Sequence, residues 1–78
     1  MSRVVLYGRP GCHLCDDARD ALESLGVAFS ERDIEGDDAL LRRHLERIPV
    51  LEVDGEEVLE APFGEHELRE VFGTLHPG

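Results

Sequence analysis

Two cysteines, Cys12 and Cys15, stand three positions apart where the chain changes from a strand pattern to a helix pattern. An unbroken apolar run, Val4–Tyr7, lies just before them, and an amphipathic helical pattern begins directly after the first cysteine. Two thiols at this spacing on the first turn of a helix can close into a disulfide and reopen. The helix N-terminus carries a partial positive charge and free N–H groups, which stabilise a thiolate. We therefore expect the rest of the chain to form a small scaffold that holds this strand-to-helix turn at the surface.

The size and charge of the chain exclude several classes of protein. Its 78 residues allow one domain, residues 1–78, with one modest core. Eighteen carboxylates stand against eight arginines and no lysine, giving a net charge of −10, whereas nucleic acids and anionic membranes require a basic patch. The apolar runs are too short to span a membrane, and the N-terminus lacks an apolar signal region. We therefore expect a cytoplasmic protein. In that reducing compartment, we do not expect a lone cysteine pair to be a permanent structural disulfide.

The first half of the chain alternates between strand and helix patterns. The β-branched run 3–7 suits a central strand, and apolar residues at helical spacing predict a helix over 13–25 that Gly26 caps. A half-polar segment, 27–33, predicts a second strand at a sheet edge, parallel to the first through a right-handed crossover. A short helix over 39–46 follows. We expect its inward-facing residues to be Leu41 and Leu45, with Leu40 also in the core.

The second half predicts a hairpin and a final helix. Ile48-Pro49 interrupts the preceding helical pattern, and strands are expected over 50–53 and 57–60. Asp54-Gly55 between them is a strong hairpin signal, so these two strands should be antiparallel. A last helix is expected over 65–75, with an apolar face made by Leu68, Val71, Phe72 and Leu75.

The resulting order, β-α-β-α-β-β-α, resembles the thioredoxin fold in its minimal form, and within it the glutaredoxins and glutaredoxin-like small proteins. The resemblance covers nearly the whole chain. Its specific stretches are residues 7–15, which include the Cys-x-x-Cys turn, residues 32–34, and residues 47–55, in which Pro49 opens the third strand. It implies an α/β protein with a four-stranded mixed sheet flanked by three helices.

The resemblance also implies an activity and a set of site residues. Proteins similar to this one exchange thiols and disulfides, and the proline matching Pro49 has a cis peptide bond and faces the cysteine pair. The backbone at Ile48 would then pair with an extended thiol substrate. Cys12, the more exposed thiol and nearer the helix dipole, is the candidate nucleophile, with a pKa below that of an ordinary thiol. Cys15 would resolve the mixed disulfide.

The resemblance implies no bound cofactor. The expected partner is glutathione or a disulfide-containing protein, with a flavoprotein of the thioredoxin-reductase type as a further source of electrons, and the chain is expected to be a monomer. Glutaredoxins bind glutathione through a Gly-Gly pair and an acidic residue after the fourth strand. Residues 60–64 here, Glu-Ala-Pro-Phe-Gly, have no such pair, so the sequence leaves glutathione open as a substrate.

For most charged residues near the cysteine pair, the sequence allows either a functional role or a simple position on the surface. His13, as a cation, would lower the pKa of the Cys12 thiol further, or else it simply faces solvent. Asp16 and Asp17 would repel a thiolate. Arg9 would neutralise the thiolate or hold a substrate carboxylate, and we include it in the expected substrate site. Arg42 and Arg43, on the short helix, either reach a peptide carboxylate near the proline or are solvated surface residues.

The remaining histidines, His44, His66 and His76, raise the question of a metal. A structural zinc site requires four ligands at compatible spacing, whereas this chain has one cysteine pair and scattered histidines. We therefore predict no metal ligand. The alternative function is a non-catalytic binding module, in which the cysteines carry an iron–sulfur cluster shared between two protomers, bind a metal, or dock a protein partner.

Overall fold

Four strands and three α-helices follow one another in the order that the sequence predicts, with one additional turn of 3₁₀-helix. The structure is a computed structural model and describes residues 3–73. Its elements are β1 (Val4–Gly8), α1 (His13–Ser24), β2 (Ser30–Asp33), the 3₁₀-helix η1 (Ile34–Gly36), α2 (Asp38–His44), β3 (Val50–Val53), β4 (Glu56–Glu60) and α3 (Glu65–Phe72). The α/β thioredoxin-like class expected from the sequence is confirmed.

The strands form one mixed sheet in the order β2-β1-β3-β4, with β1 inside and β2 at an edge. β1 runs parallel to β2 and antiparallel to β3, and β3 and β4 form the expected hairpin. Asp54 and Gly55 both have positive φ, 53° and 86°, the backbone of a two-residue turn whose twist matches that of the strands. The parallel crossover and the hairpin are both confirmed.

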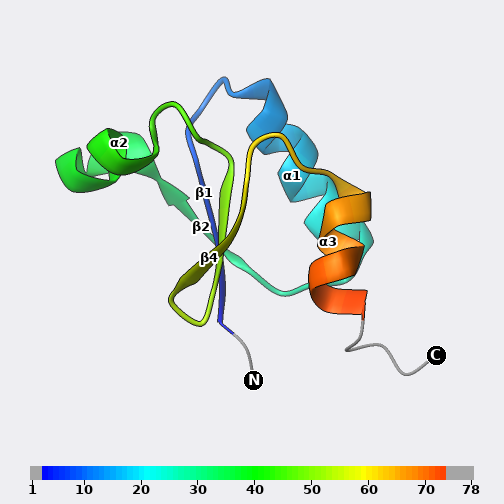
Figure 1. Ribbon diagram of the computed structural model, residues 1–78. Helices are drawn as coiled ribbons and strands as arrows, with labels where there is room; N and C mark the ends of the chain where they lie inside the picture. Colours follow the sequence, from blue (N-terminus) through cyan, green and yellow to red (C-terminus); the bar gives the residue numbers. More distant parts are fainter. Residues whose placement is uncertain (1–2, 74–78) are drawn as a thin grey trace.

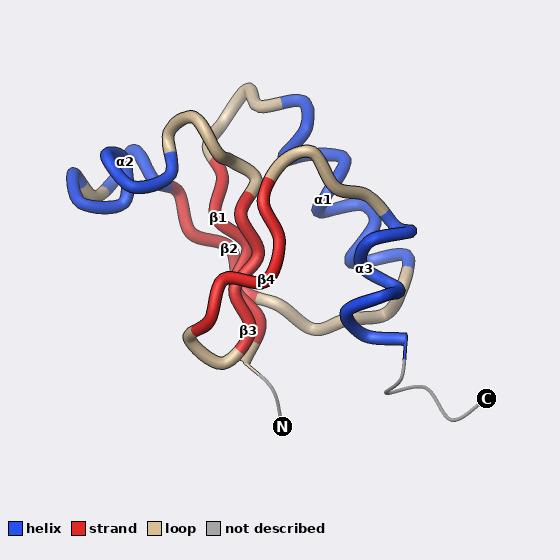
Figure 2. Tube along the Cα trace, viewed as in Figure 1, coloured by secondary structure: helices blue, strands red, loops and turns tan. Residues whose placement is uncertain are grey.

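Helices cover both faces of the sheet. Figure 1 and Figure 2 show α1 and α3 together on one side and α2 on the other. The larger core lies under α1 and α3 and consists of Val4, Leu6, Ala18, Leu22, Leu51, Phe63, Leu68 and Phe72. A smaller core of Tyr7, Ile34 and Val50 lies under α2. β1 contributes to both cores because alternate side chains of a strand point to opposite faces.

The second strand begins later than its sequence pattern predicts, at Ser30 instead of Val27. The N–H of Val27 donates to the carbonyl of Leu22 (3.1 Å) and that of Gly26 to Glu23 (3.0 Å), and Gly26 has φ 73°. This pair of bonds is a Schellman cap, which closes α1 and uses the backbone of Val27. The capping role predicted for Gly26 is confirmed, and the cap explains the shorter strand.

The prediction that Leu45 faces the core is wrong. α2 ends at His44, and Leu45 is the C-cap residue, 44% exposed, where the chain turns toward the third strand. His44 is buried instead and is 2% exposed, while Leu40 and Leu41 pack on the smaller core as expected. Leu75, assigned to the last helix, lies outside the described residues. Within residues 3–73, every helix is too short or too polar to cross a membrane.

Candidate active site

Cys12 and Cys15 are joined by a disulfide at the start of α1. Cys12 is the N-cap residue and is half-buried, whereas Cys15 is 2% exposed. The backbone N–H of Cys15 donates to Sγ of Cys12 at 3.2 Å. The first N–H groups of a helix have no partner within the helix, so the Cys12 sulfur occupies the position in which a side-chain acceptor satisfies one of them. The same contact stabilises a thiolate there after reduction.

Gly8, the last residue of β1, lets α1 lie close to the strand. A Cβ atom at Gly8 would stand 2.9 Å from Sγ and 3.1 Å from Cβ of Cys15. Any side chain here would push the buried sulfur, so glycine permits the close contact between the strand end and the first helical turn. The glycine therefore lets the buried sulfur of Cys15 lie directly against the end of β1.

The loop between α2 and β3 lies beside the end of β1. Val50 pairs with Tyr7 in the sheet, which places Pro49 next to the strand end from which the chain leads to Cys12. The Ile48–Pro49 peptide bond is cis, as the resemblance implies, and Pro49 is buried. Figure 1 shows this loop and the loop before α1 at the same end of the molecule.

The backbone of Ile48 is partly engaged within the chain. Its N–H donates to the carbonyl of His44 at 3.0 Å, and the N–H of Arg47 donates to the same carbonyl at 2.7 Å. No hydrogen bond to the Ile48 carbonyl is found among residues 3–73. Of the two groups that could pair with an extended substrate, the carbonyl is therefore the available one.

His44 is the buried polar residue behind this loop. Its ring lies against that of Tyr7, with centroids 4.9 Å apart, and Nε2 lies 3.7 Å from Oε2 of Glu57. Nδ1 is buried and has no hydrogen-bond partner within the described part of the chain, residues 3–73. Burial lowers the pKa of His44; Glu57 opposes that change, and the guanidinium groups of Arg47 and Arg43 add to it. Although the sequence raised His44 only as a metal ligand, its spacing from Leu40 and Leu41 places it on the inner face of α2.

This histidine should make the stability of the chain depend on pH. A histidine with a pKa lower in the folded than in the unfolded chain stabilises the fold while neutral. That contribution is complete above the ordinary pKa, 6.5, and is lost as the pH falls below it. We expect the free energy of unfolding to drop between about pH 7.5 and pH 5.5, measured by urea unfolding. His44→Phe keeps a ring against Tyr7 and should remove the drop; an equal drop in that variant would contradict the assignment.

The charged residues proposed from the sequence are spread over the surface. His13, the first residue of α1, is exposed. Arg9 is exposed in the loop before Cys12, with Nη1 3.8 Å from Oε2 of Glu35, a weak pair. Arg43 lies 3.6 Å from Glu57, and Arg42 is exposed on α2. Of these charged residues, Arg9 and His13 are the ones nearest to Cys12 in the chain.

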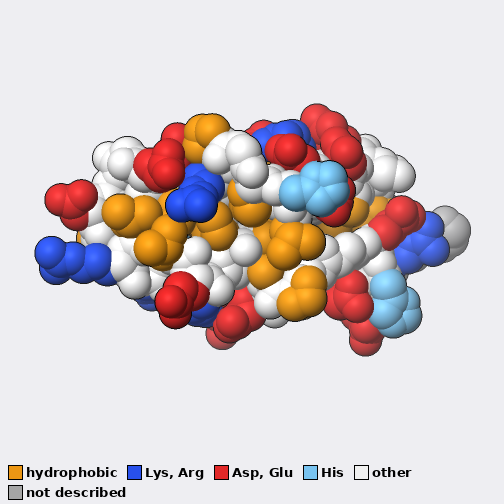
Figure 3. Space-filling model, turned by 90° about the horizontal axis from the view of Figure 1, so that it is seen from above, with side chains coloured by type: hydrophobic (Ala, Val, Ile, Leu, Met, Phe, Trp, Pro, Cys, Tyr) orange, Lys and Arg blue, Asp and Glu red, His pale blue; other side chains and the backbone are white. Residues whose placement is uncertain are grey.

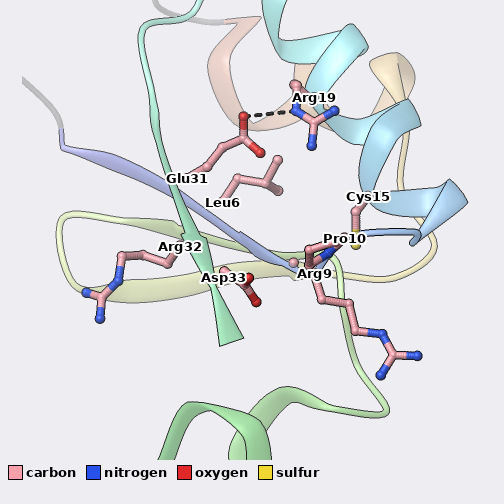
Figure 4. A pocket seen from close by; sticks show the side chains of 9 residues that line it. Leu6, Arg9, Pro10, Cys15, Arg19, Glu31, Arg32 and Asp33 are labelled. Atoms are coloured by element: carbon pink, nitrogen blue, oxygen red, sulfur yellow. Dashed lines mark hydrogen bonds and ion pairs between the residues drawn. The ribbon is translucent and has the colours of Figure 1, made fainter. Parts of the chain in front are cut away.

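A pocket of about 390 Å³ lies beside Cys15, on the side of β1 away from β3. The chain leaves β1 toward α1 on one face of the sheet and leaves β2 toward α2 on the other face, and crevices form where neighbouring strands diverge in this way. Leu6 and Pro10 are among its lining residues, and Nε of Arg19 bonds Oε1 of Glu31 (2.9 Å) along one wall. In Figure 4 the side chains of Arg9 and Arg32 extend away from the centre. The sequence did not signal this pocket, because it arises from the strand order.

No group of three or more potential metal ligands occurs among residues 3–73. Sγ of Cys12 and Sγ of Cys15 are bonded to each other, and His66 lies on α3 within 3.3 Å of Glu70. His76 lies outside the described residues.

Comparison with known proteins supports the fold described above. Residues 3–73 match the family model described as Glutaredoxin-like domain (DUF836). No curated protein matches the sequence. Among solved structures, the structural-genomics target protein XcR50 from X. campestris is 37% identical, with a TM-score of 0.79 over 91% of this chain and 96% of that one.

Two further solved structures are similar at lower identity. Protein Ne2328 from Nitrosomonas europaea is 28% identical, with a TM-score of 0.77 over 95% of this chain and 89% of that one. A glutaredoxin from Archaeoglobus fulgidus is 22% identical, with a TM-score of 0.67 over 92% of this chain and 87% of that one. At that identity the second likeness shows the fold alone.

Proposed function

Because the chain belongs to the glutaredoxin-like domain family, we propose that it is a thiol–disulfide oxidoreductase whose redox pair is Cys12 and Cys15. The observation that carries this proposal is the hydrogen bond from the Cys15 N–H to the Cys12 sulfur, at the N-cap of α1. A sulfur held there is stabilised as a thiolate, and the thiolate is the attacking species in disulfide exchange.

The proposed reaction has two exchange steps. In the reduced protein the Cys12 thiolate attacks one sulfur of the substrate disulfide; a new bond to Cys12 forms, the substrate S–S bond breaks, and one substrate thiolate leaves and takes a proton. The Cys15 thiol loses its proton and attacks the Cys12 sulfur, which releases the second substrate thiolate. The substrate gains two electrons, and the protein is left with the Cys12–Cys15 disulfide that the structure contains.

The substrate would approach from the exposed side of Cys12. We assign its binding to the Ile48–Pro49 loop, whose free Ile48 carbonyl can accept one hydrogen bond from an extended chain, and to Arg9 before the cysteine. Cys15 is too buried to meet a bulky disulfide directly, which supports its role in the second, internal step. The chain would act as a monomer in the reducing cytoplasm, where such a pair cycles.

Two sources of electrons would return the pair to its reduced form. One is glutathione, two molecules of which are oxidised for each disulfide reduced. The other is a flavoprotein of the thioredoxin-reductase type, which delivers two electrons at once. The segment after β4 has no Gly-Gly pair, and this favours the flavoprotein over glutathione.

A turnover assay with both electron sources tests the function. Reduced protein is mixed with a glutathione mixed disulfide, with glutathione and its reductase in one arm and thioredoxin reductase in the other. We expect turnover in at least one arm. In a separate reaction without glutathione, we expect Cys15→Ser to form the mixed disulfide without completing the cycle, as measured by mass spectrometry. Absence of reduction in both arms, together with iron–sulfur absorbance in protein purified without air, would instead establish the cluster-binding alternative.

A further inference from the structure

We propose that the surface around Cys12 docks polypeptides whose disulfide is flanked by lysine or arginine side chains. This inference rests on the proposed function and names its substrate class. Three features carry it: an apolar band beside the reactive sulfur, the charge around that band, and the limited backbone pairing offered by Ile48.

We call the apolar band the four apolar residues that the loops and helix ends place at this end of the molecule: Pro10, Leu14, Leu45 and Ile48. Leu14, on the first turn of α1, is 47% exposed, and Leu45 at the end of α2 is 44% exposed; Pro10 is exposed and Ile48 half-buried. Figure 3, a view onto this end of the molecule, shows hydrophobic side chains running across it. Exposed apolar side chains gathered beside a reactive group are typical of an interaction site.

The charge on the α1 side of the apolar band is negative. α1 carries Asp16, Asp17 and Asp20 on exposed positions. Asp16 is bonded by Arg19 at 3.0 Å, whereas Asp17 and Asp20 form no ion pair with any other residue in the range 3–73. Acidic side chains stand at the edges of the band in Figure 3. A cationic partner would therefore find carboxylates free to receive its charge.

Arg42 and Arg43 are exposed on the Leu45 side, in the last turn of α2, and the other two arginines at this end lie beside carboxylates. Arg9 lies beside Glu35, and Arg47 is bonded to Glu57 at 2.6 Å and to Glu60 at 3.2 Å. The whole chain carries a net charge of −10, which steers cations toward it and repels anions. A second copy of this chain or an acidic peptide would be repelled from the apolar band for the same reason.

The limited backbone contact at Ile48 favours discrimination between substrates by their side chains. Because the Ile48 N–H is donated to His44, an extended substrate can make one backbone hydrogen bond to this residue instead of two. Side-chain contacts with the apolar band and with Asp17 and Asp20 then supply more of the discrimination between substrates. Complementary charge acts mainly on the association rate, which falls as salt screens it.

A pair of synthetic peptides tests this docking surface. Both have the same length, one disulfide and the same apolar residues beside the cysteines, and differ only in having arginine or glutamate as flanking residues. The rate of oxidation of the reduced protein is measured with each and divided by the rate of dithiothreitol with the same peptide. At about 0.01 M salt we expect the arginine peptide to react tenfold faster or more, and the ratio to approach one at about 1 M salt.

Two charge-reversal variants locate the effect. Asp17→Lys changes the charge beside the apolar band, and Glu56→Lys makes the same change on the hairpin, at the opposite end of β1. We expect the ratio between the peptides to fall by about two- to fivefold in Asp17→Lys and to change little in Glu56→Lys. The ratio cancels any general effect of the variant on Cys12 reactivity.

Two results would overturn the inference: equal normalised rates for the two peptides, or equal losses in the two variants. Bis(2-hydroxyethyl) disulfide, which is uncharged, separates this failure from that of the proposed function. If it is reduced while the peptides show no preference, only the docking inference is wrong. If it is not reduced, the oxidoreductase function fails and the inference fails with it.

Discussion

Cys12→Ser abolishes disulfide reduction: we expect turnover to fall on the order of a thousandfold or more, to the background of the assay. Serine keeps the shape of the N-cap and accepts the same N–H from Cys15, but its hydroxyl is not ionised near neutral pH and does not attack a disulfide. Cys15 cannot replace it, because Cys15 is 2% exposed behind Gly8 and the first helical turn. The measurement is the release of thiol from a small disulfide under steady-state conditions.

The variant also separates chemistry from folding. Since serine is a favourable N-cap residue, we expect the far-ultraviolet circular dichroism of Cys12→Ser to match that of the reduced parent chain. Cys15→Ser provides the matched comparison, because it removes the other sulfur and should still release one thiol per protein molecule in a single burst. Turnover retained in Cys12→Ser would refute the assignment of the nucleophile.

Leu22→Ala is expected to cost about 2–5 kcal/mol in the free energy of unfolding. Leu22 is 0% exposed on the inner face of α1 and belongs to the larger core with Leu6, Leu51 and Leu68. Alanine favours the helix, so the loss comes from the apolar contacts removed and the cavity left behind. A chain of this size has a total stability of roughly 4–12 kcal/mol, so this loss is a large fraction of it.

The matched control lies in the same helix. Leu14 is 47% exposed, and Leu14→Ala makes the same chemical change at the surface, for which we expect less than about 1 kcal/mol. Urea unfolding of the oxidised proteins, followed by circular dichroism, measures both. Similar losses in the two variants would contradict the assignment of Leu22 to the core and of Leu14 to the surface.

Signals that act over a few residues predicted their structures well. Asp54-Gly55 adopts the two positive φ angles that such a pair favours, and Gly26 closes α1 with a Schellman cap. The cysteine pair stands at the N-terminus of the helix that its periodicity predicts. In these cases the turn chemistry and the side-chain period depend on neighbouring residues alone.

The errors occurred where local patterns allow more than one outcome. Leu41 and Leu45 are spaced for one helical face, yet α2 ends before Leu45, and His44 occupies the buried position beside Tyr7. The sequence pattern does not reveal that a polar residue within an apolar stripe is buried, because burial depends on which residues pack against it in the folded chain. The strand predicted from Val27 begins at Ser30, after the helix cap that engages the N–H of Val27.

The sequence by itself determined the order of the elements and the position of Cys12 at a helix start, because spacing, capping and turn residues act locally. Only the tertiary structure decided the strand order β2-β1-β3-β4, which brings Pro49 beside the end of β1 and opens a pocket next to Cys15 on its other side. It also decided that the Ile48 N–H donates to His44, whereas the Ile48 carbonyl accepts no hydrogen bond from the residues that the structure describes. These features join residues distant in the chain, and such contacts depend on how helices and strands pack together.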